Sequence, residues 1–234
     1  MTRAAVVSFV AMLGSVTTGW ARERPPAYPH MASVEQYLMA DRDGEIALAR
    51  SAAPSSISGA AKVLVLGRHG YQTGAEGKNG FVCLVERGFM ASFSEPEFWN
   101  PKIRGPLCFN PPGVRSILPS VLKRTELILS GMPAAQIITT MKAAYARKEL
   151  PMPLPGALSY MQSKQQYLND AVGPWVPHLM FHVPPTDNGD WGANLAGAPI
   201  MSGEPAQDGP EPIKIFMVPV RTWSDGTPAP DMKM

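Results

Sequence analysis

The sequence has little of what marks a nucleic-acid-binding or membrane-spanning protein. Its formal net charge is only +2, whereas an extensive nucleic-acid footprint needs clustered Lys and Arg, so we expect no nucleic-acid partner. Its one candidate membrane span, Ala4 to Val16, is shorter than the ~20 apolar residues that a span requires. Proline (25) and glycine (21) are frequent, but they fall short of the roughly 25–30% that marks low-complexity disorder. A folded, loop-rich globular domain is therefore expected.

Complete catalytic and metal-binding motifs are also missing. Ser120 and Lys123 have the Ser-x-x-Lys spacing of penicillin-binding serine enzymes, but neither Ser-Asp-Asn nor Lys-Thr-Gly occurs in the chain. The spacing of Asp187, Asn188 and Asp190 does not fit an EF-hand calcium loop. The sequence predicts no cofactor and no metal, and it leaves open whether the protein is an enzyme.

The first 21 residues have the pattern of a secretory signal peptide. Arg3 supplies a positive start, Ala4 to Val16 is mostly apolar, and Gly19-Trp20-Ala21 fits the small-x-small cleavage pattern. The alternative is an uncleaved membrane anchor, which the short apolar run disfavours. We expect cleavage after Ala21, a periplasmic or secreted location, and no stable membrane span in the mature chain.

Export changes the interpretation of the two cysteines, Cys83 and Cys108. In an oxidising compartment an even pair favours a disulfide. The competing interpretation is a thiolate metal site, but the chain has no Cys-x-x-Cys and no histidine beside either cysteine. A disulfide would close a loop of about 25 residues and stabilise the fold by about 3 kcal/mol.

Hydrophobic periodicity and turn residues predict a single α+β domain over residues 32–226, with an extended lead-in at 22–31 and a flexible tail at 227–234. About three helices are expected, at 33–52, from about Val114 or Ser120 to Ser130, and at 133–148. The first three strands are expected to form an antiparallel meander, because Gly67, Gly70 and Asn79-Gly80 supply turns between them. The predicted strands are 62–66, 71–76, 81–87, 157–163, 178–183 and 213–220. The connection at 94–119 carries no predicted strand, and no predicted helix before about residue 114. The connection at 184–212 carries no predicted strand or helix, and it is either an ordered cover or disordered.

Three segments together resemble a group of uncharacterised exported bacterial proteins of unknown function. They are residues 79–87, residues 97–101 and residues 177–181. The resemblance covers most of the mature chain. It implies export and carries no activity.

Arg68-His69-Gly70 follows the apolar run Val63 to Leu66 and resembles the start of the histidine phosphatases. In that family His is the phosphorylated nucleophile, and a guanidinium fork matches the phosphate oxygens. The family motif leads into a helix, whereas residues 71–80 have turn signals and are typical of a strand and hairpin. An exposed turn with solvated Arg68 and His69 is the favoured interpretation.

His178, Met180 and His182 share one face of a predicted strand. They could bind a soft metal such as copper. However, the two histidines would lie roughly 13 Å apart, too far to share an ion on a flat strand. We therefore expect one partly buried, hydrogen-bonded histidine and one exposed histidine.

The remaining candidates for a ligand site are amphipathic residues of the kind that line clefts: Tyr160, Lys164, Tyr167, Trp175 and His178. The connection 184–212 could cover them. The alternative is that the aromatic residues belong to the core and its rim. The leading hypothesis is a non-catalytic exported domain that binds a small molecule or a protein partner. The alternative is a periplasmic histidine-phosphatase-like hydrolase that uses Arg68 and His69.

Overall fold

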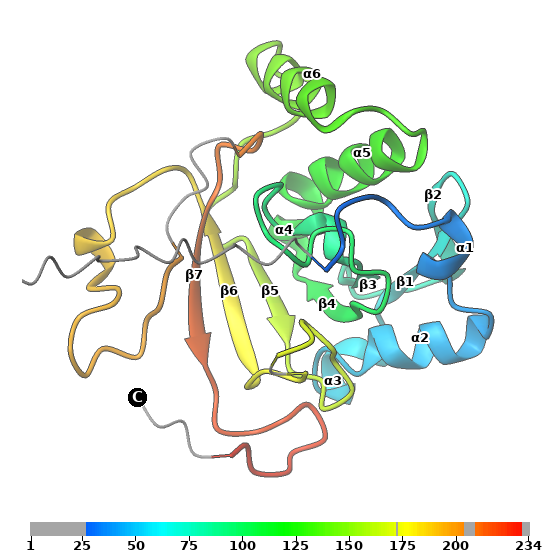
Figure 1. The fold of residues 1–234 in the computed structure, drawn as a ribbon. Coiled ribbons are helices and arrows are strands. Elements are labelled where there is room, and N and C mark those ends of the chain that lie inside the picture. The colour runs from blue at the N-terminus through cyan, green and yellow to red at the C-terminus, as the bar shows by residue number, and fades with distance from the viewer. Residues whose placement is uncertain (1–26, 172, 204–208, 231–234) are drawn as a thin grey trace, which may run out of the picture.

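The computed structural model describes residues 27–171, 173–203 and 209–230. The predicted signal peptide, the first part of the lead-in and residues 231–234 of the predicted tail lie outside these ranges. The described residues form an α+β fold, as predicted, in which one mixed sheet carries helices on both faces (Figure 1).

The α-helices of the described ranges are α1 (Val34–Tyr37), α2 (Arg42–Arg50), α3 (Ser55–Ser58), α4 (Pro111–Ser116), α5 (Leu118–Leu129) and α6 (Ala134–Ala146). The strands are β1 (Lys62–Gly67), β2 (Gly70–Ala75), β3 (Val82–Glu86), β4 (Gly105–Phe109), β5 (Leu158–Met161), β6 (His178–Val183) and β7 (Lys214–Pro219). Two short 3-10 helices are η1 (Gly88–Met90) and η2 (Gly189–Trp191). The predicted helix at 33–52 is split into α1 and α2, where Asp41 caps α2 by accepting a hydrogen bond from the backbone N–H of Asp43.

The strand order is β2-β1-β3-β4-β5-β6-β7. Neighbouring strands are antiparallel except β1 and β3, which pair in parallel through Lys62 with Val82 and Val63 with Cys83. The sequence predicted an antiparallel meander, in which β3 would pair with β2. This prediction is wrong, because β3 pairs in parallel with β1. After β2 the chain lies next to the residues that precede β1, and the backbone N–H of Lys78 donates a hydrogen bond to the Ala60 carbonyl. Asn79-Gly80 then turns the chain into β3 rather than closing a hairpin.

Strand β4 lies inside the segment that was predicted to be a connection without a strand. Its five residues are all buried, and its partner along its full length is β3. The strand was not predicted because proline is rare inside sheets, and Pro106 lies within it. Pro106 is tolerated here because β5 pairs with β4 only at Cys108 and Phe109, beyond the proline.

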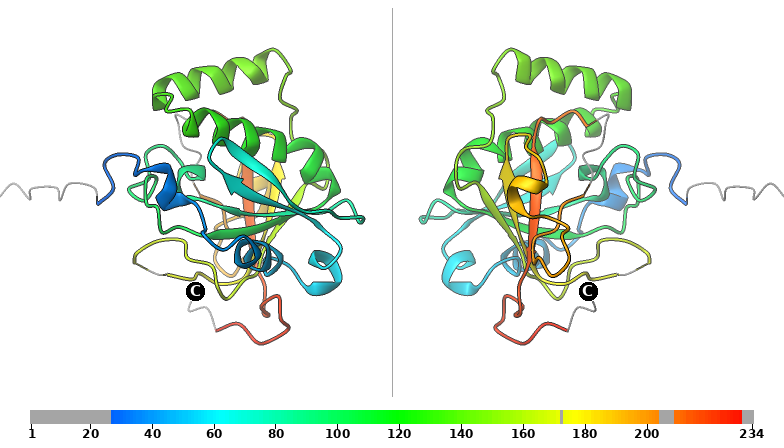
Figure 2. Two further views of the ribbon diagram at one scale, coloured as in Figure 1. Left: turned by 90° about the vertical axis from the view of Figure 1, so that its right-hand side faces the viewer. Right: turned by 90° about the vertical axis from the view of Figure 1, so that its left-hand side faces the viewer.

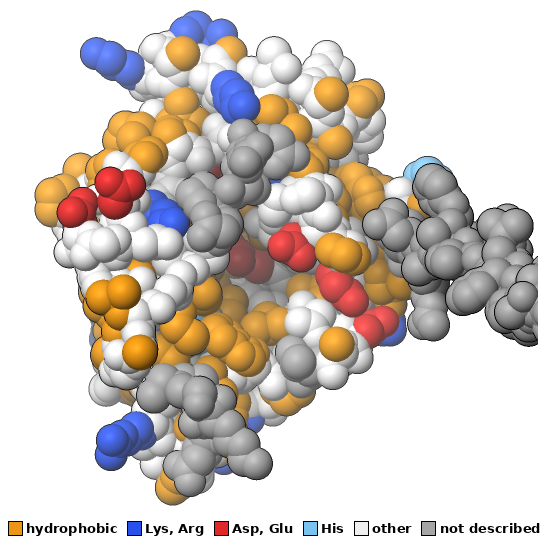
Figure 3. Space-filling model, turned by 60° about the vertical axis from the view of Figure 1, so that its left-hand side comes forward, with side chains coloured by type: hydrophobic (Ala, Val, Ile, Leu, Met, Phe, Trp, Pro, Cys, Tyr) orange, Lys and Arg blue, Asp and Glu red, His pale blue; other side chains and the backbone are white. Residues whose placement is uncertain are grey.

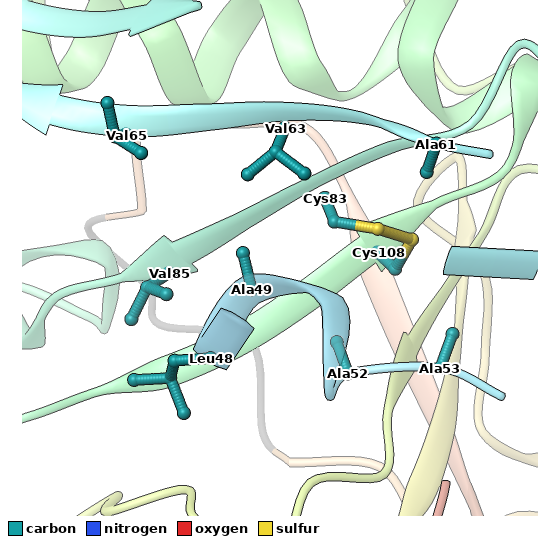
Figure 4. Packing of buried hydrophobic residues seen from close by; sticks show 10 residues of the cluster. All are labelled: Leu48, Ala49, Ala52, Ala53, Ala61, Val63, Val65, Cys83, Val85 and Cys108. Carbon is teal, nitrogen blue, oxygen red and sulfur yellow. A yellow bond between two sulfur atoms is a disulfide. The ribbon is translucent and has the colours of Figure 1, made fainter. Parts of the chain in front are cut away.

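One face of the sheet packs against α2 and contains the predicted disulfide. Cys83 on β3 and Cys108 on β4 lie directly opposite each other, with 4.0 Å between their Cα atoms, and form a disulfide that is fully buried. Figure 4 shows the bond among small apolar side chains from α2 and from β1. The predicted disulfide is confirmed.

The opposite face of the sheet packs against α4 and α5, and α6 lies on the outer side of α5 (Figure 2). Ile137, Met141 and Ala144 form the buried face of α6, as the helical periodicity predicted. On β3, β6 and β7, some side chains on the α5 side of the sheet line a cavity. This cavity contains the site described below.

The connection from β6 to β7 is structured in its described part, residues 184–203 and 209–213. Trp191 in η2 stacks on Phe216 of β7 with ring centroids 4.4 Å apart. Met201 pairs with Met217 through two backbone hydrogen bonds. The part that contains Trp191 therefore covers the face of β7 that points away from α5. No helix of the described residues has the length and apolar character needed to cross a membrane.

Candidate functional site

The candidates predicted from the sequence do not form one cleft. Tyr160 pairs with Leu179 across β5 and β6, whereas His178 pairs with Met161, so Tyr160 and His178 lie on opposite faces of the sheet. Tyr160 packs against the cluster that contains the disulfide, and its ring contacts Phe81 with centroids 6.4 Å apart.

Trp175 and His178 do lie together. Their rings meet edge to face, with centroids 4.8 Å apart. His178 is buried, its Nδ1 lies 2.8 Å from the Val176 carbonyl oxygen, and burial lowers its pKa. These contacts fit a hydrogen-bonded core histidine.

Lys164 and Tyr167 take part in separate surface contacts. Lys164 forms an exposed ion pair with Asp225, at 2.9 Å. Tyr167 donates a hydrogen bond to Asp170, at 2.6 Å, and Asp170 also accepts from Lys102. This carboxylate links the segment after β5 to the connection before β4, which is a structural role.

Arg68 and His69 form the exposed turn between β1 and β2. A strand follows Gly70, whereas the phosphatase motif leads into a helix. Arg68 pairs with Glu35 on the surface. Arg68 and His69 therefore lie in an exposed turn, which is the interpretation that the sequence favoured.

The face of the sheet next to α5 contains a cavity of about 260 Å³. Its walls come from β3, β4, β6, β7, α5 and the segment just before β7. The side chains that line it are mainly apolar, including Met90, Phe109, Ile117, Val121, Met180, Ile213 and Ile215. Figure 3 shows a hollow on this side of the molecule, with hydrophobic and acidic side chains around it.

Four titratable side chains also line this cavity: Glu86, Arg124, His182 and Glu211. We call them the polar group of the cavity. They come from the end of β3, the middle of α5, β6 and the segment before β7. None of them was among the residues predicted to line a cleft, and His182 was considered from the sequence as a possible metal ligand.

Arg124 and Glu211 are paired with each other. The Nη1 of Arg124 lies 3.5 Å from the Oε2 of Glu211, and its Nη2 donates to the Ala91 carbonyl. The guanidinium also lies over the ring of Phe93, 4.6 Å from its centroid. Burial lowers the pKa of Arg124 and raises the pKa of Glu211, and the attraction between the two opposes both shifts. Glu211 therefore largely balances the charge of Arg124, while the Nε of Arg124 has no hydrogen-bond partner among the described residues.

Glu86 is different, because its carboxylate accepts no hydrogen bond and has no ion pair with any described residue. Burial raises its pKa to about 7, although the positive charge of Arg124 acts in the opposite direction. A carboxylate with this pKa is half protonated near neutral pH and offers an acceptor that the described part of the chain does not use.

His182 contributes a second unused polar atom. Its Nε2 lies 2.8 Å from the Ser159 hydroxyl, and its Nδ1 has no hydrogen-bond partner among the described residues. Burial lowers its pKa to about 4, so the ring is neutral at physiological pH. The expectation of one exposed histidine on β6 is wrong, since His178 and His182 are both buried. His178 packs against Trp175, and His182 packs against Phe109.

Within the described residues, no group of three or more His, Cys, Asp or Glu side chains is placed to hold a metal ion. Comparison with protein-family models, curated proteins and solved structures found no match for this chain. The resemblance to exported bacterial proteins stays a prediction, and what the site does has to be argued from its own geometry.

Proposed function

We propose that this chain is an exported, non-catalytic binding domain that takes a small, mainly apolar molecule into the cavity beside α5. Ligand sites are typically concave and apolar, with a few polar groups that fix the orientation of the ligand. The cavity has this composition. Its volume of about 260 Å³ exceeds the roughly 150 Å³ of an engineered apolar cavity that binds benzene.

The observation that carries the proposal is the unpaired carboxyl of Glu86, which is partly buried in the wall of the cavity. Charged groups that are partly withdrawn from water are normally paired or hydrogen-bonded, because an apolar environment disfavours an isolated charge. Perturbed carboxyl groups of this kind concentrate at functional sites. A ligand that donates a hydrogen bond to Glu86 would supply the missing partner.

Binding can be tested with three probes that share one aromatic ring: benzyl alcohol, benzylamine and benzoate. We expect at least one of them to bind at millimolar concentration, detected by saturation-transfer NMR on the purified protein. In Met180→Trp, which fills the cavity with a larger ring, the binding should disappear. Leu195→Trp is the matched control, because Leu195 is 63% exposed and does not line the cavity.

The proposal fails if none of the three probes binds at about 10 mM, which corresponds to a binding free energy weaker than about 3 kcal/mol. It also fails if Met180→Trp binds the probes as well as the wild type while remaining folded, as judged by its thermal melt.

Export is the second part of the proposal. The buried disulfide supports it, because stable disulfides are typical of oxidising compartments. The signal-peptide pattern of the first 21 residues supports it independently. Mass analysis of the protein from a periplasmic extract should give a chain that begins at Arg22. A periplasmic product that still begins at Met1 would contradict cleavage.

A further inference from the structure

We propose that the cavity beside α5 selects small organic cations, such as protonated primary amines with an apolar body. This inference rests on the proposed function, since it specifies the chemical class of ligand for the same cavity.

The balance of charge in the cavity favours a cation. Glu86 and Glu211 are acidic and Arg124 is basic, so full ionisation leaves one negative charge without a partner. His182 adds no positive charge, because its ring is neutral at physiological pH. An anionic ligand would add a second uncompensated charge, whereas a cation would neutralise the first.

The contacts of Arg124 and Glu86 within the protein show which of the two side chains is available to a ligand. The guanidinium of Arg124 already binds Glu211 and the Ala91 carbonyl, and it lies against the ring of Phe93. Its Nε has no hydrogen-bond partner among the described residues, so one donor of an otherwise engaged guanidinium is left over. Glu86 has no such partner among the described residues. The donor missing from the cavity is the kind that an ammonium group supplies.

The imidazole of His182 fits the same ligand class. A neutral histidine can donate through Nε2 to the Ser159 hydroxyl, 2.8 Å away, which leaves Nδ1 as an acceptor. Nδ1 has no partner among the described residues. An ammonium group has three donors, so it can use both a carboxylate and a second acceptor. The apolar lining, which includes Met180 and Val121, suits the remainder of the ligand.

A cation must compete with the proton of Glu86. The pKa of Glu86 is about 7, so below about pH 7 its carboxyl is mostly protonated in the unliganded protein. Binding of an ammonium group at such a pH releases this proton. Affinity for the cation should then fall as the pH is lowered from about 8 to about 5, approaching tenfold per pH unit at the acidic end. Arg124 keeps its charge over this range, and His182 begins to titrate only near the acidic end. Burial raises the pKa of Glu211 although Arg124 opposes the shift, and protonation of Glu211 weakens cation binding in the same direction as protonation of Glu86.

The experiment compares the three matched probes by titration calorimetry or NMR at about pH 8, where benzylamine is still protonated, as alkylamines of this kind are. We expect benzylamine to bind at least tenfold more tightly than benzyl alcohol, and benzoate to bind most weakly. Glu86→Gln keeps the size of the side chain and removes its charge. It should reduce the affinity for benzylamine at least tenfold and change the affinity for benzyl alcohol less than threefold. Glu76→Gln is the control for loss of one carboxylate, because Glu76 is exposed just after β2 and does not line the cavity.

The possible results separate the two proposals. If benzyl alcohol or benzoate binds as tightly as benzylamine, cation selectivity is wrong and the binding function stands. The same conclusion follows if benzylamine binds Glu86→Gln as well as it binds the wild type. If no probe binds, both proposals are wrong. Affinity for benzylamine that is constant between about pH 8 and about pH 5 would also overturn the role of Glu86.

Discussion

A buried ion pair between Glu45 of α2 and Arg87, just after β3, provides a sharp test of how this fold is held together. The Nη2 of Arg87 lies 2.8 Å from the Oε1 of Glu45, and the two side chains are 0% and 2% exposed. The remaining donors of Arg87 reach the backbone carbonyls of Tyr37 and Val85. Glu45 in turn accepts from the backbone N–H of Leu66, at 3.2 Å. The pair therefore connects the N-terminal helices to the centre of the sheet.

We predict that Glu45→Gln lowers the free energy of unfolding by about 3–5 kcal/mol, the usual cost of removing one partner from a buried ion pair. The cost arises because Arg87 keeps its charge and cannot reach water. Glutamine has nearly the same shape and still offers an oxygen to Leu66, so the loss reports the charge rather than a cavity or an orphaned backbone N–H.

Urea denaturation with the disulfide intact measures this loss. For a slope of about 2–3 kcal/mol per molar urea, the midpoint should move down by roughly 1–2 M with no change in slope. Glu35→Gln is the matched control, since Glu35 pairs with Arg68 in an exposed position. Surface ion pairs contribute little, so this variant should melt at the same urea concentration as the wild type.

The double variant Glu45→Met with Arg87→Met completes the test. Replacing a whole buried ion pair by apolar side chains is often close to neutral, so it should be more stable than Glu45→Gln. A loss below about 1 kcal/mol in Glu45→Gln would refute the reasoning. So would a double variant that loses as much stability as the single variants Glu45→Met and Arg87→Met lose when their losses are added together.

Three further predictions follow from the site and the sheet. His178→Ala should cost about 1–3 kcal/mol in urea melts, because it removes a buried ring and leaves the Val176 carbonyl unpaired; a loss below about 1 kcal/mol would restore His178 as a cleft residue. Glu86→Gln should stabilise the protein at about pH 8 by on the order of 2 kcal/mol and leave it unchanged near pH 4. The unfolded carboxyl ionises from pH 4.5, while the folded one keeps its proton up to about 7, so the wild type loses stability across this window; equal effects at both pH values would contradict it. Alkylation of the denatured, unreduced protein should find no free thiol at Cys83 or Cys108, and reduction should cost about 3 kcal/mol; two modified cysteines in protein from the periplasm would disprove the bond in the exported form.

The sequence predicted the features that depend on local patterns. The buried face of α6 follows from apolar residues three and four positions apart, and the β1–β2 hairpin follows from the glycines at its turn. The disulfide followed from counting cysteines in a chain with an export signal. The partner of each strand is a different matter, because pairing depends on contacts between distant segments. The parallel contact of β1 with β3, and the strand β4 with its Pro106, could not be read from local patterns.

The site was missed for the same reason, although two of its residues leave a signal in the sequence. Arg124 occupies a position on the buried face of α5, three residues after Val121 and four before Ile128. Glu86 continues the alternation of Val82 and Leu84 on the face of β3 that packs against α5. A charged residue at a position that the period assigns to the core is a useful indicator of a site or a buried ion pair. Nothing in the sequence shows that these two charged residues line the same cavity.

Glu45, which is buried, and Glu86, which is partly buried, differ in whether the described part of the chain supplies donors to their carboxylates. Glu45 receives donors from Arg87 and from the backbone of Leu66, so its own chain satisfies it and its removal should destabilise the protein. Glu86 receives none from the described residues, so its removal should stabilise the protein at neutral and alkaline pH. A group that lowers the stability of the free protein is typical of a functional site, where stability is given up for binding. Opposite signs for Glu45→Gln and Glu86→Gln in the same urea melts at about pH 8 would assign one carboxylate to the fold and the other to the ligand.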